Sequence, residues 1–363
     1  MMQFDPTEEQ EELVGMLRDL LSSRSDSGAV RRAMESESGY DADLWRVLCE
    51  EIGAASLAIP EEFGGAGFTA FETHLVLEEL GAAMTPSPYL GTVAIAAQAV
   101  LCSGDADACE RLLPGIAAGE TTAALVWADD RGLFDATRFG VSFDGASLSG
   151  TAPLVIDGST ADVLLVLAAT SDGVGLFEVA GDAAGVTRVA TPAMDTTLRF
   201  AQVTFDGAAA VRIGNAVDTE RLRDIAATAV TALQVGGARR ILDLTVEYSK
   251  QRVQFGRQIG SFQALKHRMA DMHLLVETAT TASRAAASAV ASGAELGPLA
   301  ALAKTWASDA FSTVAGEAVQ LHGGIAITWE HDAHLYFKRA HATRELFGSP
   351  EAIRVREAER LLA

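Results

Sequence analysis

The sequence predicts a mainly helical α+β protein in which a small β-domain separates two helical regions. In the first third of the chain, apolar residues recur at helical spacing. The middle third contains short apolar or alternating runs separated by Gly, Asp and Ser, which are typical of antiparallel strands. Long stretches of charged helical pattern then return. We therefore expect an N-terminal helical domain at 1–118, a middle β-domain at 119–212 and a C-terminal helical bundle at 213–363.

The composition excludes several classes of protein. With 363 residues, 49% of them hydrophobic, the chain is long and apolar enough for a large core in two or three packed units. Its formal net charge of −21 disfavours nucleic acid and anionic membranes as partners, because both require a basic face. No run reaches the roughly 18 apolar residues that a membrane-spanning helix needs.

The first residues and the cysteines indicate the cellular compartment. The segment MMQFDPTEEQ is acidic and lacks the apolar core of a secretory signal. Cys49, Cys102 and Cys109 have neither metal-binding nor disulfide spacing, so we expect them to be small buried apolar residues in a reducing environment. The sequence therefore predicts a cytoplasmic protein.

Four helices are expected before residue 118. The first begins with Asp5 as its N-cap and Pro6 at the first helical position, and Glu8 three residues after the cap completes a capping box. The others are predicted at 41–59, 68–84 and 91–104. The loop IPEEFGGAGF separates the second helix from the third.

Strands and then long helices follow. The runs TTAALVWA, ASLSGTAPLVI, ADVLLVLAA, VGLFEVAG and LRFAQVTFDG predict the strands of the β-domain. Beyond them, a helical pattern from about 217 to 252 predicts a helix of roughly 50 Å, at 1.5 Å per residue. Two more long helices are expected at 261–293 and 298–324, with one or two in the tail at 331–362.

Three segments carry recognisable motifs: IPEEFGGAGF, YSKQRVQFGRQIGSFQALKHRMADM and QLHGGIAIT. Together they resemble the flavin-dependent acyl-CoA dehydrogenase family over nearly the whole chain. The resemblance implies N-terminal helices, a central β-domain and a C-terminal four-helix bundle. It also implies FAD as cofactor and an acyl-CoA thioester as substrate. In this family a carboxylate removes the α-proton while the flavin N5 takes a hydride from the β-carbon.

The carboxylate that acts as base in this family is missing from its usual place. It is most often a Glu in a Tyr-Glu-Gly-Thr turn near the C-terminus. An ungapped alignment from Arg339 puts Gly348 there, or Phe347 after a slip of one residue, and neither accepts a proton. Other members carry the base on the long helix, at the position of Ala226 here. Asp224 lies about 200° around that helix from Ala226, and is either a displaced base or a charge on a solvated face near the helix N-terminus.

The middle domain departs from the family as well. The segment ALVWADDRGLFDATRFG stands where the family has Thr-Glu-Pro-x-x-Gly-Ser-Asp, whose backbone and hydroxyls contact the flavin ring and the thioester. The family's Trp-Ile-Thr strand, which packs on the flavin ring, looks replaced by LVIDG at 154–158. Val155 cannot supply an aromatic face, and we expect Asp157 to place a negative charge near the ring.

The motifs that in this family reach across a dimer interface to the neighbour's ADP moiety are intact. The matching residues are Arg252, Gln254, Phe255, Gln263, Gln320, Gly323 and Gly324. We expect Arg252 to pair with pyrophosphate oxygens, and Gln254 and Gln263 to offer amides to phosphate, ribose or adenine. Phe255 offers a ring for packing, and the glycine pair lets the backbone approach the dinucleotide. The alternative is a simple helix break with Gly256 at its end and surface amides around it.

The resemblance therefore implies a subunit whose own flavin site is degraded and which completes the flavin site of another subunit. The expected assembly is an α2β2 hetero-oligomer with an acyl-CoA dehydrogenase partner and FAD at a subunit interface. Such paired subunits occur in actinobacterial enzymes for bulky substrates such as sterol side-chain thioesters, and electron-transfer flavoprotein is the implied electron acceptor. Two alternatives remain open. One is an active homo-oligomer with a displaced base, Asp224 being the first suspect, and the other is a flavin-free scaffold subunit.

The tail contains a cluster of histidines that could suggest a metal site. His331, His334 and His341 lie close in sequence to Glu330 and Asp332. Their spacing matches no metal-protease motif and no cysteine accompanies them. We expect the segment WEHDAHLYFKRAH to begin a helix and to line an interface, and we expect no metal.

Overall fold

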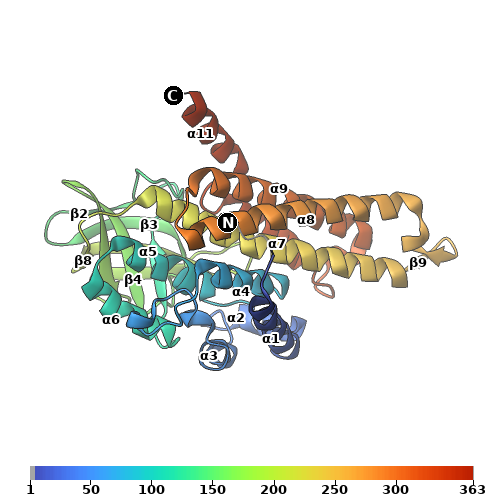
Figure 1. Ribbon diagram of the computed structural model, residues 1–363, viewed down its shortest axis with the longest axis horizontal. Helices are drawn as coiled ribbons and strands as arrows, with labels where there is room; N and C mark the ends of the chain where they lie inside the picture. Colours follow the sequence, from blue (N-terminus) through green and yellow to red (C-terminus); the bar gives the residue numbers. More distant parts are fainter. Residues whose placement is uncertain (1–4, 363) are drawn as a thin grey trace.

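The computed structural model describes residues 5–362, and it has the expected order of N-terminal helices, β-sheet and C-terminal helices (Figure 1). Part of the segment considered as a secretory signal, residues 1–4, lies outside the described residues. The N-terminal region consists of α1 (Glu8–Arg24), α2 (Ser27–Glu35), α3 (Ala42–Glu50), the 3₁₀ turns η1 (Ala54–Ser56) and η2 (Glu61–Phe63), α4 (Ala70–Ala82), the π-helix η3 (Leu90–Ala96), α5 (Ala97–Ser103) and α6 (Ala106–Ala117). Within the described part of the chain, no helix combines the length and apolar character needed to cross a lipid bilayer.

The first helix begins two residues later than predicted. Its N-cap is Thr7 rather than Asp5, because the Thr7 hydroxyl accepts from the Gln10 backbone N–H while the Gln10 side chain accepts from the Thr7 N–H at 2.9 Å. The capping box therefore exists with a different pair of residues. The predicted helix at 41–59 ends at Glu50, and Gly53 follows with φ +72°.

Two helices of this region, α2 and α6, were absent from the prediction. Only Val30 and Ala33 of α2 are buried, so its apolar periodicity is weak. The α6 helix contains Pro114, which normally indicates a helix end. Asp105 caps α6 by accepting from the backbone N–H of Ala108 at 3.0 Å.

The β-domain is an eight-stranded sheet with order β6-β7-β3-β2-β4-β5-β8, and β1 pairs with β4. Its strands are β1 (Ala123–Val126), β2 (Val141–Phe143), β3 (Leu148–Ile156), β4 (Val163–Thr170), β5 (Gly173–Ala180), β6 (Val186–Ala190), β7 (Phe200–Ala208) and β8 (Val211–Ile213). Most neighbours pair antiparallel as predicted, but β4 runs parallel to both β1 and β2. Alternate residues of the strands belong to two cores, one inside the β-domain and one against the helices.

The C-terminal region contains α7 (Thr219–Gln251), the hairpin β9 (Val253–Gln254) and β10 (Arg257–Gln258), the turn η4 (Ile259–Ser261), α8 (Gln263–Ser292), α9 (Gly297–His322), the turn η5 (Gly323–Ile327), α10 (Ala333–Glu345) and α11 (Pro350–Leu362). The helices α7, α8 and α9 lie side by side, with the sheet at one end of the molecule and the hairpin at the other (Figure 1). The predicted long helices are thus confirmed to within a few residues.

Glycines allow α4 and α7 to pack with their backbones in contact. A Cβ added at Gly236 of α7 would overlap the carbonyl oxygen of Glu78 in α4, and a Cβ at Gly81 of α4 would meet the backbone of Leu233. On the neighbouring face of α7, Gly237 gives room to the ring of Phe311 in α9. The three helices therefore cross at these small residues.

Candidate functional site

The loop between α10 and α11 holds the position at which the family carries its base. Gly348 has φ +113° and Phe347 has φ +56°, so the loop is built from two consecutive left-handed residues. The Phe347 side chain is only 2% exposed and contacts two aromatic rings of the β-domain segment, Trp127 at 5.9 Å and Phe134 at 4.4 Å between centroids. These three side chains form an aromatic cluster that fills the space between the loop and the β-domain.

A buried lysine anchors this loop from the other side. Lys304 of α9 is fully buried, and its Nζ donates to the carbonyl oxygens of Arg344 at 2.8 Å and Gly348 at 3.1 Å, and to the Ser308 hydroxyl at 3.0 Å. All three ammonium protons are thereby used. Burial lowers the pKa of Lys304 to about 7. Sequence reasoning missed this residue, although a single Lys in the apolar run PLAALAKTWA of a helix is an available signal.

Raising the pH above 7 should stabilise the protein through Lys304. Its pKa is about 7 in the folded chain against 10.5 for a free lysine, so the unfolded chain binds more protons between these values and the free energy of unfolding rises with pH. Each pH unit in this window contributes at most about 1.4 kcal/mol. Urea unfolding at pH 7, 8 and 9 measures the slope, and Lys304→Met should flatten it. If the free energy of unfolding rises equally with pH in the wild type and in Lys304→Met, Lys304 is not the source of the pH dependence.

The structure places Asp224 away from this loop. Asp224 is 7% exposed, pairs with Arg223 at 3.3 Å and faces Gly297 at the start of α9. Lys304, which holds the loop, lies seven residues and about 10 Å further along α9. Burial raises the pKa of Asp224 and the neighbouring Arg223 opposes that rise. The carboxylate borders an open, mixed-charge pocket of about 470 Å³ rather than the aromatic cluster.

The strand LVIDG has a different orientation from the one inferred by alignment. Val155 is fully buried in the inner core of the β-domain, whereas Leu154 and Ile156 face the helices, and neither is aromatic. Asp157 adopts φ +56° and its carboxyl group packs against the backbone of Gly91 in η3. Burial raises the pKa of Asp157 to about 7, so close to neutral pH this carboxyl is partly protonated.

The residues predicted to bind a dinucleotide lie at the exposed end of α7. Arg252, Gln254 and Gln263 are all exposed, and the described residues offer no hydrogen-bond or ionic partner to the Arg252 guanidinium. Phe255 is 91% exposed at the hairpin tip with φ +54°, followed by Gly256 at φ +75°. An exposed aromatic ring and unpaired donors at a turn are typical of a surface that meets a ligand or a partner.

The second motif lies at the same end of the bundle. Tyr248, one turn before Arg252, stacks on His322 at 4.5 Å between ring centroids. His322 ends α9, and Gly323 (φ +67°) and Gly324 follow it with open space beside their Cα atoms. Gln320 is exposed on the last turn of α9. The two predicted motifs are therefore brought together by the ends of α7 and α9.

This end of the molecule is remote from the aromatic cluster of the same chain. Gln234 of α7 donates to the Thr343 hydroxyl beside the loop at 3.2 Å. Arg252 lies 18 residues further along the same helix, about 27 Å away. The hairpin and the sheet accordingly occupy opposite ends of the molecule in Figure 1. The predicted dinucleotide-binding residues are therefore well separated from the loop of Gly348 within this chain.

The residues at the bundle end fit the phosphates, riboses and adenine of FAD. Arg252 would supply a forked cation for a diphosphate, the glutamines would supply amides, and the open space beside Gly323 and Gly324 would let the backbone approach the dinucleotide. The Nε2 atom of His322 is buried without a partner, so sequence reasoning that allowed this residue only its backbone missed an orphaned polar atom. FAD, when bound, supplies the hydride acceptor of the reaction.

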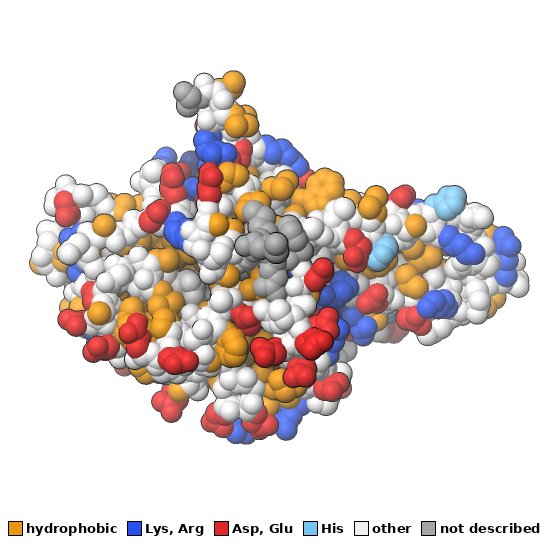
Figure 2. All heavy atoms as spheres, in the orientation of Figure 1, with side chains coloured by type: hydrophobic (Ala, Val, Ile, Leu, Met, Phe, Trp, Pro, Cys, Tyr) orange, Lys and Arg blue, Asp and Glu red, His pale blue; other side chains and the backbone are white. Residues whose placement is uncertain are grey.

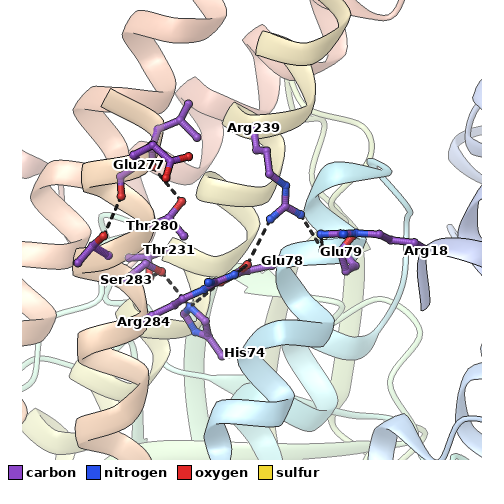
Figure 3. Close-up of polar contacts among 12 residues, drawn as sticks. Arg18, His74, Glu78, Glu79, Thr231, Arg239, Glu277, Thr280, Ser283 and Arg284 are labelled. Atoms are coloured by element: carbon purple, nitrogen blue, oxygen red, sulfur yellow. Dashed lines mark hydrogen bonds and ion pairs between the residues drawn. The ribbon is translucent and has the colours of Figure 1, made fainter. Parts of the chain in front are cut away.

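A buried charge network between α1, α4, α7 and α8 was also missed (Figure 3). Glu78 is 1% exposed and accepts two hydrogen bonds from Arg284 at 2.9 and 2.8 Å, with Arg239 at 3.5 Å. Arg239 and Arg18 in turn hold Glu79 at 2.7 and 2.9 Å. Burial is the largest single influence and raises the pKa of Glu78, but Arg284, His74 and Arg239 together lower this pKa below its ordinary value. A carboxylate held in this way joins helices and makes a poor base.

Sequence comparisons agree with this fold and these motifs. The profile of the acyl-CoA dehydrogenase N-terminal domain matches residues 7–120, and that of the acyl-CoA dehydrogenase C-terminal domain matches residues 214–362. Acyl-CoA dehydrogenase IpdE2 of Mycolicibacterium smegmatis is 44% identical over 354 residues, which cover 97% of this chain and 99% of that protein. The protein of the same name from Mycobacterium tuberculosis is 42% identical over 369 residues, covering 98% of each.

Two solved complexes contain chains of the same fold. One chain of a variant of the steroid ACAD Tcur3481-Tcur3483 matches with a TM-score of 0.90 and 32% identity, over 98% of this chain and 99% of that chain. One chain of the ChsE4-ChsE5 complex from Mycobacterium tuberculosis matches with a TM-score of 0.91 and 29% identity, over 99% of each. Fold and motifs define a flavoprotein oxidoreductase. The chain belongs to the acyl-CoA dehydrogenase family, whose members use FAD.

Proposed function

We propose that this chain is the subunit of a heteromeric acyl-CoA dehydrogenase that lacks a catalytic base and completes the FAD site of its partner. In the partner, an acyl-CoA thioester is desaturated between its α- and β-carbons. This chain contributes Arg252, Gln254, Phe255 and Gln263 from the hairpin, and Gln320, Gly323 and Gly324 from the end of α9. The assembly is α2β2, with FAD at the interface and electron-transfer flavoprotein as the electron acceptor.

One observation carries this proposal: the chain's own base position is closed while its dinucleotide motifs are exposed. Phe347 beside Gly348 is 2% exposed in the aromatic cluster, whereas Phe255 at the hairpin is 91% exposed. Neither Phe347 nor Gly348 has a group that could take the α-proton, and an exposed ring beside an unpaired Arg252 suits a partner's cofactor. The two-protein composition of the Tcur3481-Tcur3483 and ChsE4-ChsE5 structures supports a heteromer.

The relatives also suggest a substrate class. The Tcur3481-Tcur3483 enzyme is a steroid ACAD and is 32% identical to this chain. A steroid-derived acyl-CoA is therefore the first substrate to test. Specificity for such a bulky group would come from the partner's cleft, because the aromatic cluster leaves the cleft of this chain filled.

Flavin content and assembly mass test the proposal. The chain is purified alone and co-expressed with each acyl-CoA dehydrogenase paralogue of its own genome, and flavin per chain is measured by absorbance. We expect no flavin in the lone chain and one FAD per pair in an α2β2 complex. One flavin per subunit in the lone chain, reduced by an acyl-CoA, would overturn the proposal. Absence of flavin from every complex would favour the scaffold alternative.

Replacing Arg252 by Ala should release flavin from the mixed complex. A charge-assisted contact to a diphosphate contributes roughly 1.5–3 kcal/mol, so the FAD affinity should fall about 10- to 100-fold. Arg257→Ala in the same hairpin is the matched control, because its guanidinium already stacks on Phe262 at 3.9 Å. Titration of the apo-complex with FAD measures both. Equal losses in the two variants would point to general disruption of the hairpin.

The alternative of an active homo-oligomer is tested at Asp224. If Asp224 were the displaced base of a homo-oligomer, the chain alone would be active and Asp224→Asn would abolish its turnover. We expect turnover by the mixed complex to stay within about twofold of the wild type, because Asp224 faces Arg223 and Gly297 rather than the loop of Gly348. Steady-state oxidation of a steroid-derived acyl-CoA with a dye acceptor measures the rate. A loss of 100-fold or more with unchanged flavin content would restore Asp224 as the base.

A further inference from the structure

An exposed apolar surface adjoins the Gln-x-x-Gly-Gly motif. We call it the η5 surface and define it by Ile325, Ile327 and Trp329, whose side chains are 36%, 75% and 64% exposed. The surface begins one residue after Gly324, and Thr328 between its last two members is extended. Contiguous exposed apolar side chains of this size are uncommon on a monomer and mark an interaction site.

Trp329 is held in a fixed environment although its ring is exposed. The Lys338 ammonium lies 4.7 Å from the ring centroid and the Arg31 guanidinium 5.4 Å from it, while His334 meets its edge at 4.6 Å. Arg31 is itself fixed by Asp332 at 2.6 Å. The cations on the ring and the contact with His334 restrict the Trp329 side chain before binding. It therefore loses less conformational entropy when a partner binds.

Positive charge is concentrated toward one end of this acidic chain, although Glu330 and Asp332 also lie close to Trp329 in sequence. The net charge is −21, yet Lys and Arg side chains gather toward the end of the molecule that carries β9, whereas Asp and Glu prevail over the N-terminal helices (Figure 2). Lys250, Arg252 and Arg257 lie at the hairpin, and Arg31 and Lys338 flank Trp329. A complementary surface would be apolar at its centre with a carboxylate-rich rim.

We propose that the η5 surface is the protein–protein anchor that docks this chain on the flavin-holding face of its dehydrogenase partner, with Trp329 as its central residue. This inference rests on the proposed function and names the contact that assembly requires in addition to the cofactor. The occupant is the partner subunit because the surface is continuous with Gly323 and Gly324, which would approach the partner's dinucleotide. Docking of the apolar surface thereby sets the position of the flavin-binding motifs.

The test compares two exposed tryptophans of this chain. Trp329→Ala should weaken association with the co-expressed paralogue at least 30-fold, because truncation of a central interface tryptophan has an effect of this size. Trp329→Phe should recover most of the affinity. Trp306→Ala is the control, since Trp306 is 40% exposed on α9 and its Nε1 donates to Thr278 at 3.0 Å within this chain. Affinity is measured by titrating labelled chains, and flavin content is recorded in parallel.

A charge reversal tests the expected rim of the partner. Lys338→Glu should weaken association more at 50 mM than at 500 mM salt, because the rim contact is electrostatic.

The outcomes separate the anchor from the proposed function. If Trp329→Ala keeps the wild-type affinity, or if Trp306→Ala loses as much affinity, the anchor is overturned and the proposed function stays intact. If Trp329→Ala separates the chains but the wild-type pair holds two flavins, the anchor stands and the proposed function falls. Arg252→Ala should release flavin without separating the chains, which distinguishes cofactor contact from docking.

Discussion

Replacing Gly236 by Ala is expected to destabilise the protein by about 3 kcal/mol, at the upper end of the range for overpacked cores. The added methyl group would overlap the Glu78 carbonyl oxygen, which is backbone and cannot rotate away. Relief requires α4 and α7 to separate, and Gly81 on α4 also lies against the backbone of Leu233. Urea unfolding followed by circular dichroism measures the change in the free energy of unfolding.

Gly316→Ala in α9 provides the matched control. Gly316 also lies inside a long helix, but a Cβ there would have no neighbour within 4 Å. Alanine is a better helix former than glycine, so this variant should gain about 0.5–1 kcal/mol. The two glycine substitutions should therefore move stability in opposite directions. A similar shift in both would mean that α4 and α7 are not in backbone contact at Gly236.

The second large effect is expected for Arg284→Met, which should cost about 3–5 kcal/mol. The variant leaves the carboxylate of Glu78, 1% exposed, with Arg239 at 3.5 Å as its nearest charged partner. His74 lies farther away, at 3.9 Å, and burial lowers its pKa to about 4. Adding Glu78→Gln to Arg284→Met removes the uncompensated charge and should recover much of the loss. Thermal unfolding of both single variants and the double variant gives the coupling between the two side chains.

A surface ion pair gives the comparison for that result. Arg46 and Glu50 are 2.9 Å apart, and both side chains are more than half exposed. Arg46→Met should therefore leave the free energy of unfolding nearly unchanged, because water screens an exposed ion pair. A loss at Arg284 no larger than that at Arg46 would show that the network in Figure 3 makes no greater contribution than a solvated pair.

The helices were predictable where periodicity is long and uninterrupted. The spacing of apolar residues located α7, α8 and α9 to within a few residues, because each buries a long face. The α6 helix escaped because Pro114 is a helix-breaking signal that tertiary packing overrides. The cap of α1 was misplaced because Asp5 and Thr7 are both good N-caps, and only the hydrogen bonds distinguish them.

The residues of the candidate site likewise fall into those that sequence patterns indicate and those that only the fold brings together. Motif spacing singled out Arg252 and Gly323, which the structure places at the ends of α7 and α9, and their binding of a dinucleotide stays a prediction. Lys304 was not identified because its acceptors are backbone carbonyls on another helix and in a loop, which have no sequence signature. Glu78 and Arg284 are 206 residues apart, so their pairing depends on how α4 and α8 pack. The orientation of Val155 required strand register, where a shift of one residue reverses the face.

The aromatic cluster changes which substitutions natural selection would tolerate. A cleft that performs proton transfer constrains the charge, orientation and solvation of its base. If this chain lacks a base as proposed, the packing of Trp127, Phe134 and Phe347 is constrained only by volume, and apolar replacements of similar size should persist through evolutionary drift. The hairpin and the end of α9 would instead have to change together with another gene. Evidence that this chain takes part in catalysis would then come from correlated substitutions in this chain and in its partner.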